Sequence, residues 1–261
     1  LPMILLSFDI EEFDLPLEYG LSLSWEEQIR ISSEGCRKIL SCLSRYKVKA
    51  TFFCTARFAE NTPELIREIS ESGHEVASHG YEHSVFEEAD LKRSKDILEA
   101  LTGQCVGGFR MPRMANVSDA ALVEAGYTYN SSLNPTFLPG RYNHWHEPRT
   151  WFRQNGLLQL PASTTPNIRF PLFWLSFHHL PGALYRRLAL RTYKHDGYLL
   201  TYFHPWEFMP IQQIKGLPYT VTHNAGNNAE VRLDKLIGFF RKRNKPFGTF
   251  REFIETLPPI S

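Results

Sequence analysis

Short apolar runs alternate with amphipathic helical patterns along most of the chain. The apolar runs predict strands, which we expect at 3–8, 49–54, 74–78, 106–110, 127–131, 157–160, 198–203 and 247–250. Between them, helical spacing of apolar residues predicts helices at 24–46, 62–73, 87–102, 118–126 and 229–244, with another at the carboxyl end. Capping signals at Ser24, Thr62 and Ser118 support three of the helix starts.

Strands that alternate with helices of this length indicate a parallel sheet with helices packed outside it. Seven or eight such units in roughly 250 residues fit a distorted α/β barrel of the (β/α)7 type better than two doubly wound domains. No repeat or low-complexity linker divides the chain, so we expect a single domain over residues 1–261. Two stretches interrupt the alternation, and we expect long loops at 134–156 and 166–190 over one end of the barrel.

The composition is that of an ordinary globular chain, with 43% hydrophobic and 22% charged residues. A formal net charge of +1 gives no basic surface of the kind that nucleic acid requires. No segment approaches the roughly 18 uninterrupted apolar residues of a membrane span, and the apolar start is too short for a signal peptide. The four cysteines form no C-x-x-C pair, which predicts buried free thiols and makes the cytosol the expected location.

Unusual polar side chains stand where four of the predicted strands end. Because all strands of a parallel barrel point the same way, side chains at their carboxyl ends converge on one rim, where active sites are built. They are Asp9 and Glu11 after the first strand, His79 and His83 after the third, Arg110 after the fourth, and His204 after the strand at 198–203.

His79 and His83 are four residues apart, so their imidazoles could reach one metal ion from a single turn. The chain has ten histidines, so this spacing is weak evidence alone, and two loop histidines are the alternative interpretation. Asp9 and Glu11 add an oxygen ligand, which gives the three protein ligands and open position typical of a catalytic divalent ion. An acidic surface turn is the other interpretation of these acids, but ionised groups at the end of an apolar strand are costly unless paired.

Five segments, taken together and in order, resemble the NodB-type polysaccharide deacetylases, carbohydrate esterase family 4. The segments are Ser7 to Glu11, Thr51 to Phe53, Ser78 to His83, Phe109 to Pro112 and Phe203 to Glu207. The single residue between the two acids and the His-Pro-Trp-Glu ending are similar to the branch associated with exopolysaccharide and capsule biosynthesis. The resemblance implies a distorted barrel of about seven strands and metal-dependent hydrolysis of N-acetyl groups on amino sugars of a glycan.

Carried over by position, the resemblance also implies roles for individual residues. Glu11, His79 and His83 would hold a divalent metal, with zinc expected first and cobalt, nickel or manganese as alternatives. Asp9 would be the general base, and His204 the general acid. Arg110 would orient the base and keep it ionised, while Tyr81, Pro112 and Trp206 would contact the N-acetylated glycan.

The sequence departs from the family pattern at several positions. The usual adjacent pair of aspartates is here Asp9 and Glu11, so the base and the ligand could be exchanged, or Glu12 could take part. Arg113 stands where an aromatic residue commonly follows the proline, and Asn130 where the family often has an aspartate. Two other functions therefore stay open: a deformylase or other hydrolase of a non-acetyl amide, and a catalytically silent glycan-binding barrel.

The apolar segment 170–177 is followed by three arginines, Arg186, Arg187 and Arg191. It could line the substrate groove, pair two subunits or make peripheral contact with a membrane surface. A buried lid segment is the alternative interpretation.

Overall fold

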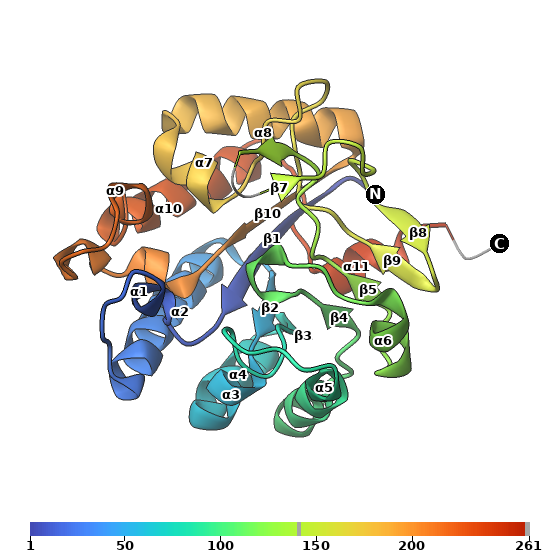
Figure 1. The fold of residues 1–261 in the computed structure, drawn as a ribbon. Coiled ribbons are helices and arrows are strands. Elements are labelled where there is room, and N and C mark those ends of the chain that lie inside the picture. Colours follow the sequence, from blue (N-terminus) through green and yellow to red (C-terminus); the bar gives the residue numbers. More distant parts are fainter. Residues whose placement is uncertain (140–141, 259–261) are drawn as a thin grey trace.

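The structure, a computed structural model, describes residues 1–139 and 142–258 and contains one curled sheet surrounded by helices (Figure 1). Seven parallel strands and one antiparallel strand form this sheet, in the order β10-β1-β2-β3-β4-β5-β9-β8. The strands are β1 (Met3–Ile10), β2 (Thr51–Cys54), β3 (Glu75–Ser78), β4 (Gly108–Phe109), β5 (Tyr129–Asn130), β8 (Phe152–Gln154), β9 (Leu157–Gln159) and β10 (Tyr198–Phe203).

Helices cover the outside of the sheet, with α2, α4 and α5 below it and α8 and α10 above it in Figure 1. The helices are α1 (Leu15–Glu18), α2 (Trp25–Tyr46), α3 (Ala56–Asn61), α4 (Pro63–Glu71), α5 (Ala89–Thr102), α6 (Asp119–Glu124), α7 (Trp174–His179), α8 (Gly182–Asp196), α9 (Tyr219–Thr222), α10 (Asn227–Arg241) and α11 (Phe250–Glu255). Short 3-10 turns lie at Pro112–Met114, Pro205–Phe208 and Ile211–Gln213. Within the residues that the structure describes, no helix is both long enough and apolar enough to cross a membrane.

The two ends of the parallel array approach each other where the chain leaves β9. The Ser163 amide donates to the Leu200 carbonyl over 2.9 Å, and the Leu200 amide donates to Ser163 Oγ over 2.9 Å. These contacts join the segment after β9 to β10, although the regular ladder stops before them. The predicted α/β fold class is therefore confirmed as a curled, incompletely closed barrel.

Central strand β1 explains why the sequence reads as an apolar run there. Its residues from Ile4 to Ile10 are buried, because the strand pairs with β2 and β10 and helices cover the sheet. Two predicted helix caps are present as hydrogen bonds: Ser24 Oγ accepts from the Glu27 amide, and Ser118 Oγ from the Ala121 amide. Thr62 does not cap α4 with its side chain, and its hydroxyl donates to the Phe58 carbonyl instead.

The expectation of a loop at 166–190 is wrong, because α7 and the first half of α8 occupy most of it. Helix α8 follows a helical pattern, in which Tyr185 and Ala189 are buried one turn apart. The apolar segment 170–177 is partly buried as well. Its residues Phe173, Trp174 and Phe177 pack into the core, as in a lid segment.

The stretch 134–156 is mostly irregular, with β8 and a small separate sheet of β6 (Phe137–Leu138) and β7 (Tyr142–Asn143). Residues 140–141 of this expected loop, and residues 259–261 at the end of the chain, lie outside the described part. The expected strand at 247–250 is wrong as well. Phe247 forms an isolated bridge with Ile4, and Phe250 starts α11 because Thr249 and Glu252 form a capping box.

The four cysteines are free thiols, three of them buried and Cys105 exposed. Burial raises the pKa of the Cys42 thiol to about 11 and that of the Cys54 thiol well above its ordinary value. Both thiols are therefore protonated and unreactive at neutral pH.

Candidate active site

Five of the six polar side chains expected at the strand ends line one pocket of about 250 Å³, and the sixth, Arg110, is buried behind Asp9. Strands β1, β3, β4 and β10 run in parallel, so their carboxyl ends open on the same rim. The residues that line the pocket are Asp9, Glu11, Leu15, Glu18, His79, His83, Arg113, Met114, Trp174, Tyr202, His204 and Trp206.

Glu11, His79 and His83 form a buried cluster with the chemistry of a metal site. Glu11 Oε2 lies 3.1 Å from His79 Nε2 and 3.2 Å from His83 Nε2. One ligand atom of each of the three residues lies within 4.8 Å of the other two. In residues 1–139 and 142–258, no second group of three such side chains meets this criterion, so the pair His144 and His146 has no metal-site geometry.

The other ring nitrogen of each histidine is fixed by a second partner. His79 Nδ1 donates to the Arg110 carbonyl over 2.8 Å, and His83 Nδ1 donates to Asp14 Oδ1 over 2.7 Å. Ser84 Oγ in turn donates to the other Asp14 oxygen. Both histidines therefore present Nε2 to Glu11, and such carbonyl and carboxylate partners are typical of metal-binding histidines. Two imidazoles and one carboxylate that leave a position open fit a catalytic divalent ion such as zinc.

Glu11 and the neighbouring histidines shift the pKa values of one another. Burial alone would raise the pKa of Glu11, but His83, the hydrogen bond from His79, and His204 together lower it to about 2. Burial would lower the pKa of His83, but Glu11 and Asp14 raise it to about 9. Before a cation binds, His83 is thus protonated at neutral pH, and a divalent cation would take the place of this proton.

Asp9 lies beside the cluster and is held by Arg110. Arg110 is completely buried, and its Nη1 donates to Asp9 Oδ1 over 2.6 Å and to Ser7 Oγ over 3.0 Å. Its Nε and Nη2 donate to the carbonyl and hydroxyl of Ser131, each over 3.0 Å. The guanidinium also lies 4.0 Å from the centre of the Phe53 ring. With its donors engaged and one face covered, Arg110 fixes the orientation of Asp9 and places a positive charge next to it.

Glu12, the carboxylate that could have replaced either acid, has other partners. It accepts hydrogen bonds from Thr55 Oγ1 and from the His83 amide, each over 2.8 Å. These bonds keep both of its oxygens away from the imidazole nitrogens, and Glu12 does not line the pocket.

His204 faces the Asp9 oxygen that Arg110 does not hold, and it belongs to a second buried group. Its Nε2 is 3.9 Å from Asp9 Oδ2, and its Nδ1 donates to Glu207 Oε1 over 2.8 Å. The other oxygen of Glu207 lies 2.6 Å from His178 Nε2. The Trp206 ring stacks on His204 at 4.9 Å, and the Trp174 ring meets it edge-on at 5.6 Å. The His204 ring is thus fixed with Nε2 toward the pocket.

The Glu207 carboxylate also sets the charge state of His204. Burial would lower the pKa of His204, but the hydrogen bond to Glu207 and the negative charges of Glu11, Glu207 and Asp9 raise it. Burial opposes ionisation of Glu207 too, yet hydrogen bonds from His178 and His204 lower its pKa. The arrangement favours a protonated imidazole next to an ionised carboxylate, which is the charge state of a general acid.

Three of the residues that build the site were not predicted to take part in it: Asp14, Glu207 and His178. Asp14 belongs to the acidic stretch after β1, and Glu207 stands three residues after His204 in the position of a helix-capping acid. Both signals were visible in the sequence, although neither specified a partner. His178 offered none, because only the packing of α7 against β10 brings it to Glu207.

The residues expected to contact substrate are not equally close to the pocket. Trp206 lines it and donates from Nε1 to Glu11 Oε1 over 3.4 Å. Tyr81 and Pro112 are not part of its lining. The Tyr81 hydroxyl donates to Glu60 over 3.1 Å and its ring carries the Arg93 guanidinium at 3.7 Å, so the side chain is occupied elsewhere.

The two family positions that differ, Arg113 and Asn130, have separate outcomes. Arg113 lines the pocket, and its Nε donates to Glu18 Oε1 over 2.8 Å. Asn130 does not line the pocket, and its Oδ1 accepts a hydrogen bond from Ser132 Oγ over 2.5 Å. The carboxylate that holds His204 comes from Glu207 and does not depend on position 130.

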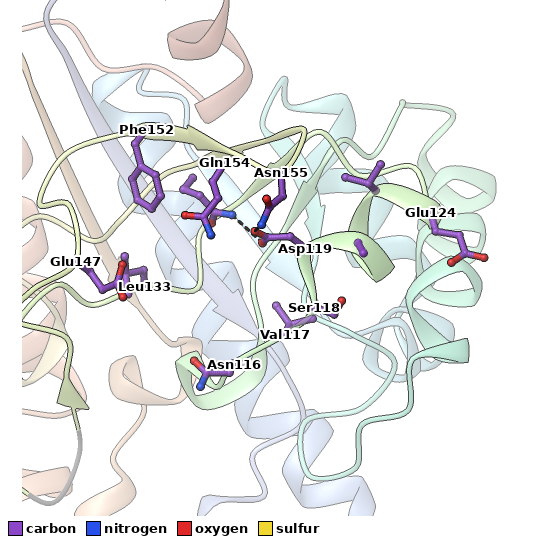
Figure 2. Close-up of a pocket in the computed structure, with 13 residues that line it drawn as sticks. Asn116, Val117, Ser118, Asp119, Glu124, Leu133, Glu147, Phe152, Gln154 and Asn155 are labelled. Atoms are coloured by element: carbon purple, nitrogen blue, oxygen red, sulfur yellow. Dashed lines mark hydrogen bonds between the residues drawn. The ribbon is translucent and has the colours of Figure 1, made fainter.

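A larger open groove of about 810 Å³, the polar groove, lies between α6 and the β8–β9 hairpin (Figure 2). Asp119 in it accepts hydrogen bonds from Gln159 over 2.9 Å and from Asn155 over 3.0 Å. The groove contains no histidine or cysteine and none of the residues of the metal cluster. The smaller pocket is therefore the candidate active site because of its chemistry rather than its size.

Comparison with known proteins relates the first half of the chain to one family. Residues 3–130 match the family model described as polysaccharide deacetylase. The peptidoglycan deacetylase of Helicobacter pylori (strain ATCC 700392 / 26695) is 30% identical over 154 residues, which are 49% of this chain and 53% of that protein. The chain thus spans about half the length of this curated relative. The first half of the chain is thus similar to the polysaccharide deacetylases, while the exopolysaccharide branch stays a prediction.

Solved structures show the same fold at low sequence identity. A putative polysaccharide deacetylase from Mycobacterium smegmatis has a TM-score of 0.66 at 22% identity, over 99% of this chain and 92% of that chain. A carbohydrate esterase family 4 pseudoenzyme from Bacillus anthracis has a TM-score of 0.53 at 14% identity, over 96% of this chain and 64% of that chain. Because the fold also occurs in a pseudoenzyme, the fold alone does not show activity.

Proposed function

We propose that the protein hydrolyses N-acetyl groups on amino sugars of a glycan, with a divalent metal as cofactor. The observation that carries the proposal is the placement of Asp9 and His204 beside one Glu11, His79 and His83 cluster in a single pocket. The relative named as a peptidoglycan deacetylase supports an N-acetylated glycan as the substrate class.

The proposed metal ligands are Glu11, His79 and His83, which present one carboxylate oxygen and two ring nitrogens toward a common point. Zinc suits this donor set best, with cobalt, nickel or manganese as alternatives. When bound, such an ion polarises an amide carbonyl and lowers the pKa of a water molecule. The chain itself supplies the groups that move protons.

Asp9 is the proposed general base. Arg110 holds one of its oxygens, and the other faces His204 across 3.9 Å, so the carboxylate is fixed where the attacking water would lose its proton. His204, with Nδ1 held by Glu207, protonates the departing sugar nitrogen from Nε2 as the carbon–nitrogen bond breaks. Each of these proton transfers is worth roughly a hundredfold to ten-thousandfold in rate.

Acetate release from N-acetylglucosamine oligomers tests the proposal. The protein is stripped with a chelator and then reloaded with zinc, cobalt, nickel or manganese before the assay. Asp9→Asn and His204→Ala are expected to keep the fold and the metal while the rate falls by roughly a hundredfold or more. Full activity in either variant would reject the role assigned to that residue.

The same experiment separates the alternative functions. Formate release from an N-formyl sugar without acetate release would identify a deformylase. Binding of the oligomer without turnover, in the metal-loaded protein, would identify a silent glycan-binding barrel. A cytosolic location, peripheral contact with a membrane, and substrate contacts of Tyr81 and Pro112 stay predictions.

A further inference from the structure

A second groove, the apolar groove, adjoins the catalytic pocket. Its volume is about 630 Å³, and its walls include Leu15, Phe137, Ile168, Phe170, Trp174 and Leu175. Leu15, Glu18 and Trp174 line both the apolar groove and the catalytic pocket. The two spaces thus share part of their walls, so the apolar groove lies next to a molecule that binds with its amide at Glu11, His79 and His83.

The apolar groove offers hydrocarbon surface that water reaches. The side chains of Ile168 and Phe137 are 70% and 56% exposed, although both are large and apolar. Exposed apolar surface that gathers beside a binding pocket is typical of a ligand site, because leaving it in water is costly.

Three of the polar side chains in the walls of the apolar groove are engaged within the protein. Thr136 Oγ1 donates to the Arg169 carbonyl over 2.7 Å, and His179 Nε2 donates to the Thr220 carbonyl over 2.9 Å. Ser176 Oγ donates to the Phe173 carbonyl over 2.9 Å. Sugar hydroxyls need hydrogen-bonding partners, and the side chains of Phe137, Ile168 and Phe170 offer none, in contrast to the amides and carboxylates of the polar groove in Figure 2.

Trp174 shows which part of the substrate faces the apolar groove. Its ring meets the His204 ring edge-on at 5.6 Å and also lines the groove. In the proposed function, His204 protonates the nitrogen that stays with the sugar. At Trp174 the groove therefore lies on the His204 side of the pocket, from which the sugar nitrogen would be protonated.

We propose that the substrate is an amino sugar joined to a hydrocarbon chain, as in a glycolipid, and that the chain lies in the apolar groove. This inference rests on the proposed deacetylation and names the class of aglycone that the site accepts. It predicts that a hydrocarbon aglycone improves catalysis while an extended N-acyl group does not.

The test compares octyl and methyl glycosides of N-acetylglucosamine and of its dimer, below the concentration at which the octyl compounds form micelles. Acetate release by the zinc-loaded protein should show a kcat/KM at least tenfold higher for the octyl glycosides, because each buried methylene contributes about fourfold. A ratio near one, or a preference for N-octanoyl over N-acetyl in the methyl glycosides, would overturn the inference.

Two variants locate the effect. Ile168→Ser is expected to lower the octyl-to-methyl ratio severalfold, because it removes exposed hydrocarbon from the groove wall. Val231→Ser is the matched control, since Val231 is 50% exposed on α10 and does not line the groove. An equal fall of the ratio in both variants would overturn the assignment to this groove.

The outcomes also separate the inference from the function on which it rests. Acetate release from both glycosides at equal efficiency would contradict the hydrocarbon site but support the deacetylase function. Absence of acetate release from every glycoside and oligomer would contradict the deacetylase function itself. A third outcome is that the protein sediments with anionic vesicles, that Ile168→Ser abolishes this binding, and that the octyl-to-methyl ratio is unchanged. This outcome would assign the groove to a membrane surface and overturn the inference.

Discussion

The two walls of the catalytic pocket are built in different ways. The metal wall, Glu11, His79 and His83, is braced by a backbone carbonyl and by Asp14, both from segments that follow strand ends. The acid wall, His204, Glu207 and His178, shares one carboxylate between two imidazoles and covers His204 with indole rings. The metal wall fixes lone pairs toward one point, whereas the acid wall fixes a proton, so damage to each should have a different signature.

The largest expected effect is the loss of a metal ligand. His79→Ala removes one of three protein ligands, so we expect the protein to lose its divalent metal and its deacetylase activity to fall below detection. Elemental analysis of the purified protein and acetate release measure the two outcomes. His146→Ala is the control, because His146 is an exposed histidine outside the cluster. Full metal content in His79→Ala would show that His79 is not a metal ligand.

The next largest effect concerns Asp14, which holds a metal-wall histidine from outside the cluster. Asp14→Asn weakens the partner of His83 Nδ1, and loss of such an outer partner costs roughly tenfold to a hundredfold in metal affinity. Competition with a fluorescent chelator measures the affinity. Activity should recover at saturating zinc, and failure to recover would mean that Asp14 has a further role in turnover.

On the acid wall we expect an effect on the pH profile with no loss of metal. Glu207 raises the pKa of His204, so Glu207→Gln should lower that pKa, and His204 should lose its catalytic proton at a lower pH than in the wild type. The alkaline limb of kcat/KM then shifts toward neutral pH, with a loss of roughly tenfold or more on that side. A pH profile at constant metal content checks this, and an unshifted limb would contradict the assignment of His204 as the acid.

The smallest expected effect concerns His178, which touches Glu207 and not the substrate pocket. His178→Asn should lower kcat/KM only a few fold and leave metal content unchanged, because His204 keeps its bond to Glu207. The variant should also lose about 1 to 3 kcal/mol of unfolding free energy, since it disturbs a buried hydrogen bond to a charged group. A larger rate loss than in Glu207→Gln would show that His178 acts on His204 by another route.

Much of this molecule could be predicted from local pattern. Strand β10 was expected at the residues where it occurs, and the Ser24 and Ser118 caps were read from side-chain chemistry. The errors fell where local signals conflict with packing. The interrupted alternation at 166–190 predicted a loop, but helices α7 and α8 form there, with Tyr185 and Ala189 of α8 buried.

Prediction of the candidate site was limited in a similar way. Glu11 and Asp9 were interchangeable in the sequence, because both follow one apolar strand and both carry a carboxylate. In the structure, Arg110 holds Asp9 and the two imidazoles face Glu11, which gives the two acids different surroundings. Long-range contacts made this distinction, and residue spacing could not.

By itself, the sequence determined the alternation of strands and helices, the kinds of polar side chain at the strand ends, and their order along the chain. Those properties follow from residue type and local periodicity. Only the tertiary structure decided that Glu207 and His178 support His204 and that an apolar groove adjoins the catalytic pocket. The reason is physical: these features depend on distances between atoms of α7, β1 and β10, which the curl of the sheet and the packing of helices set together.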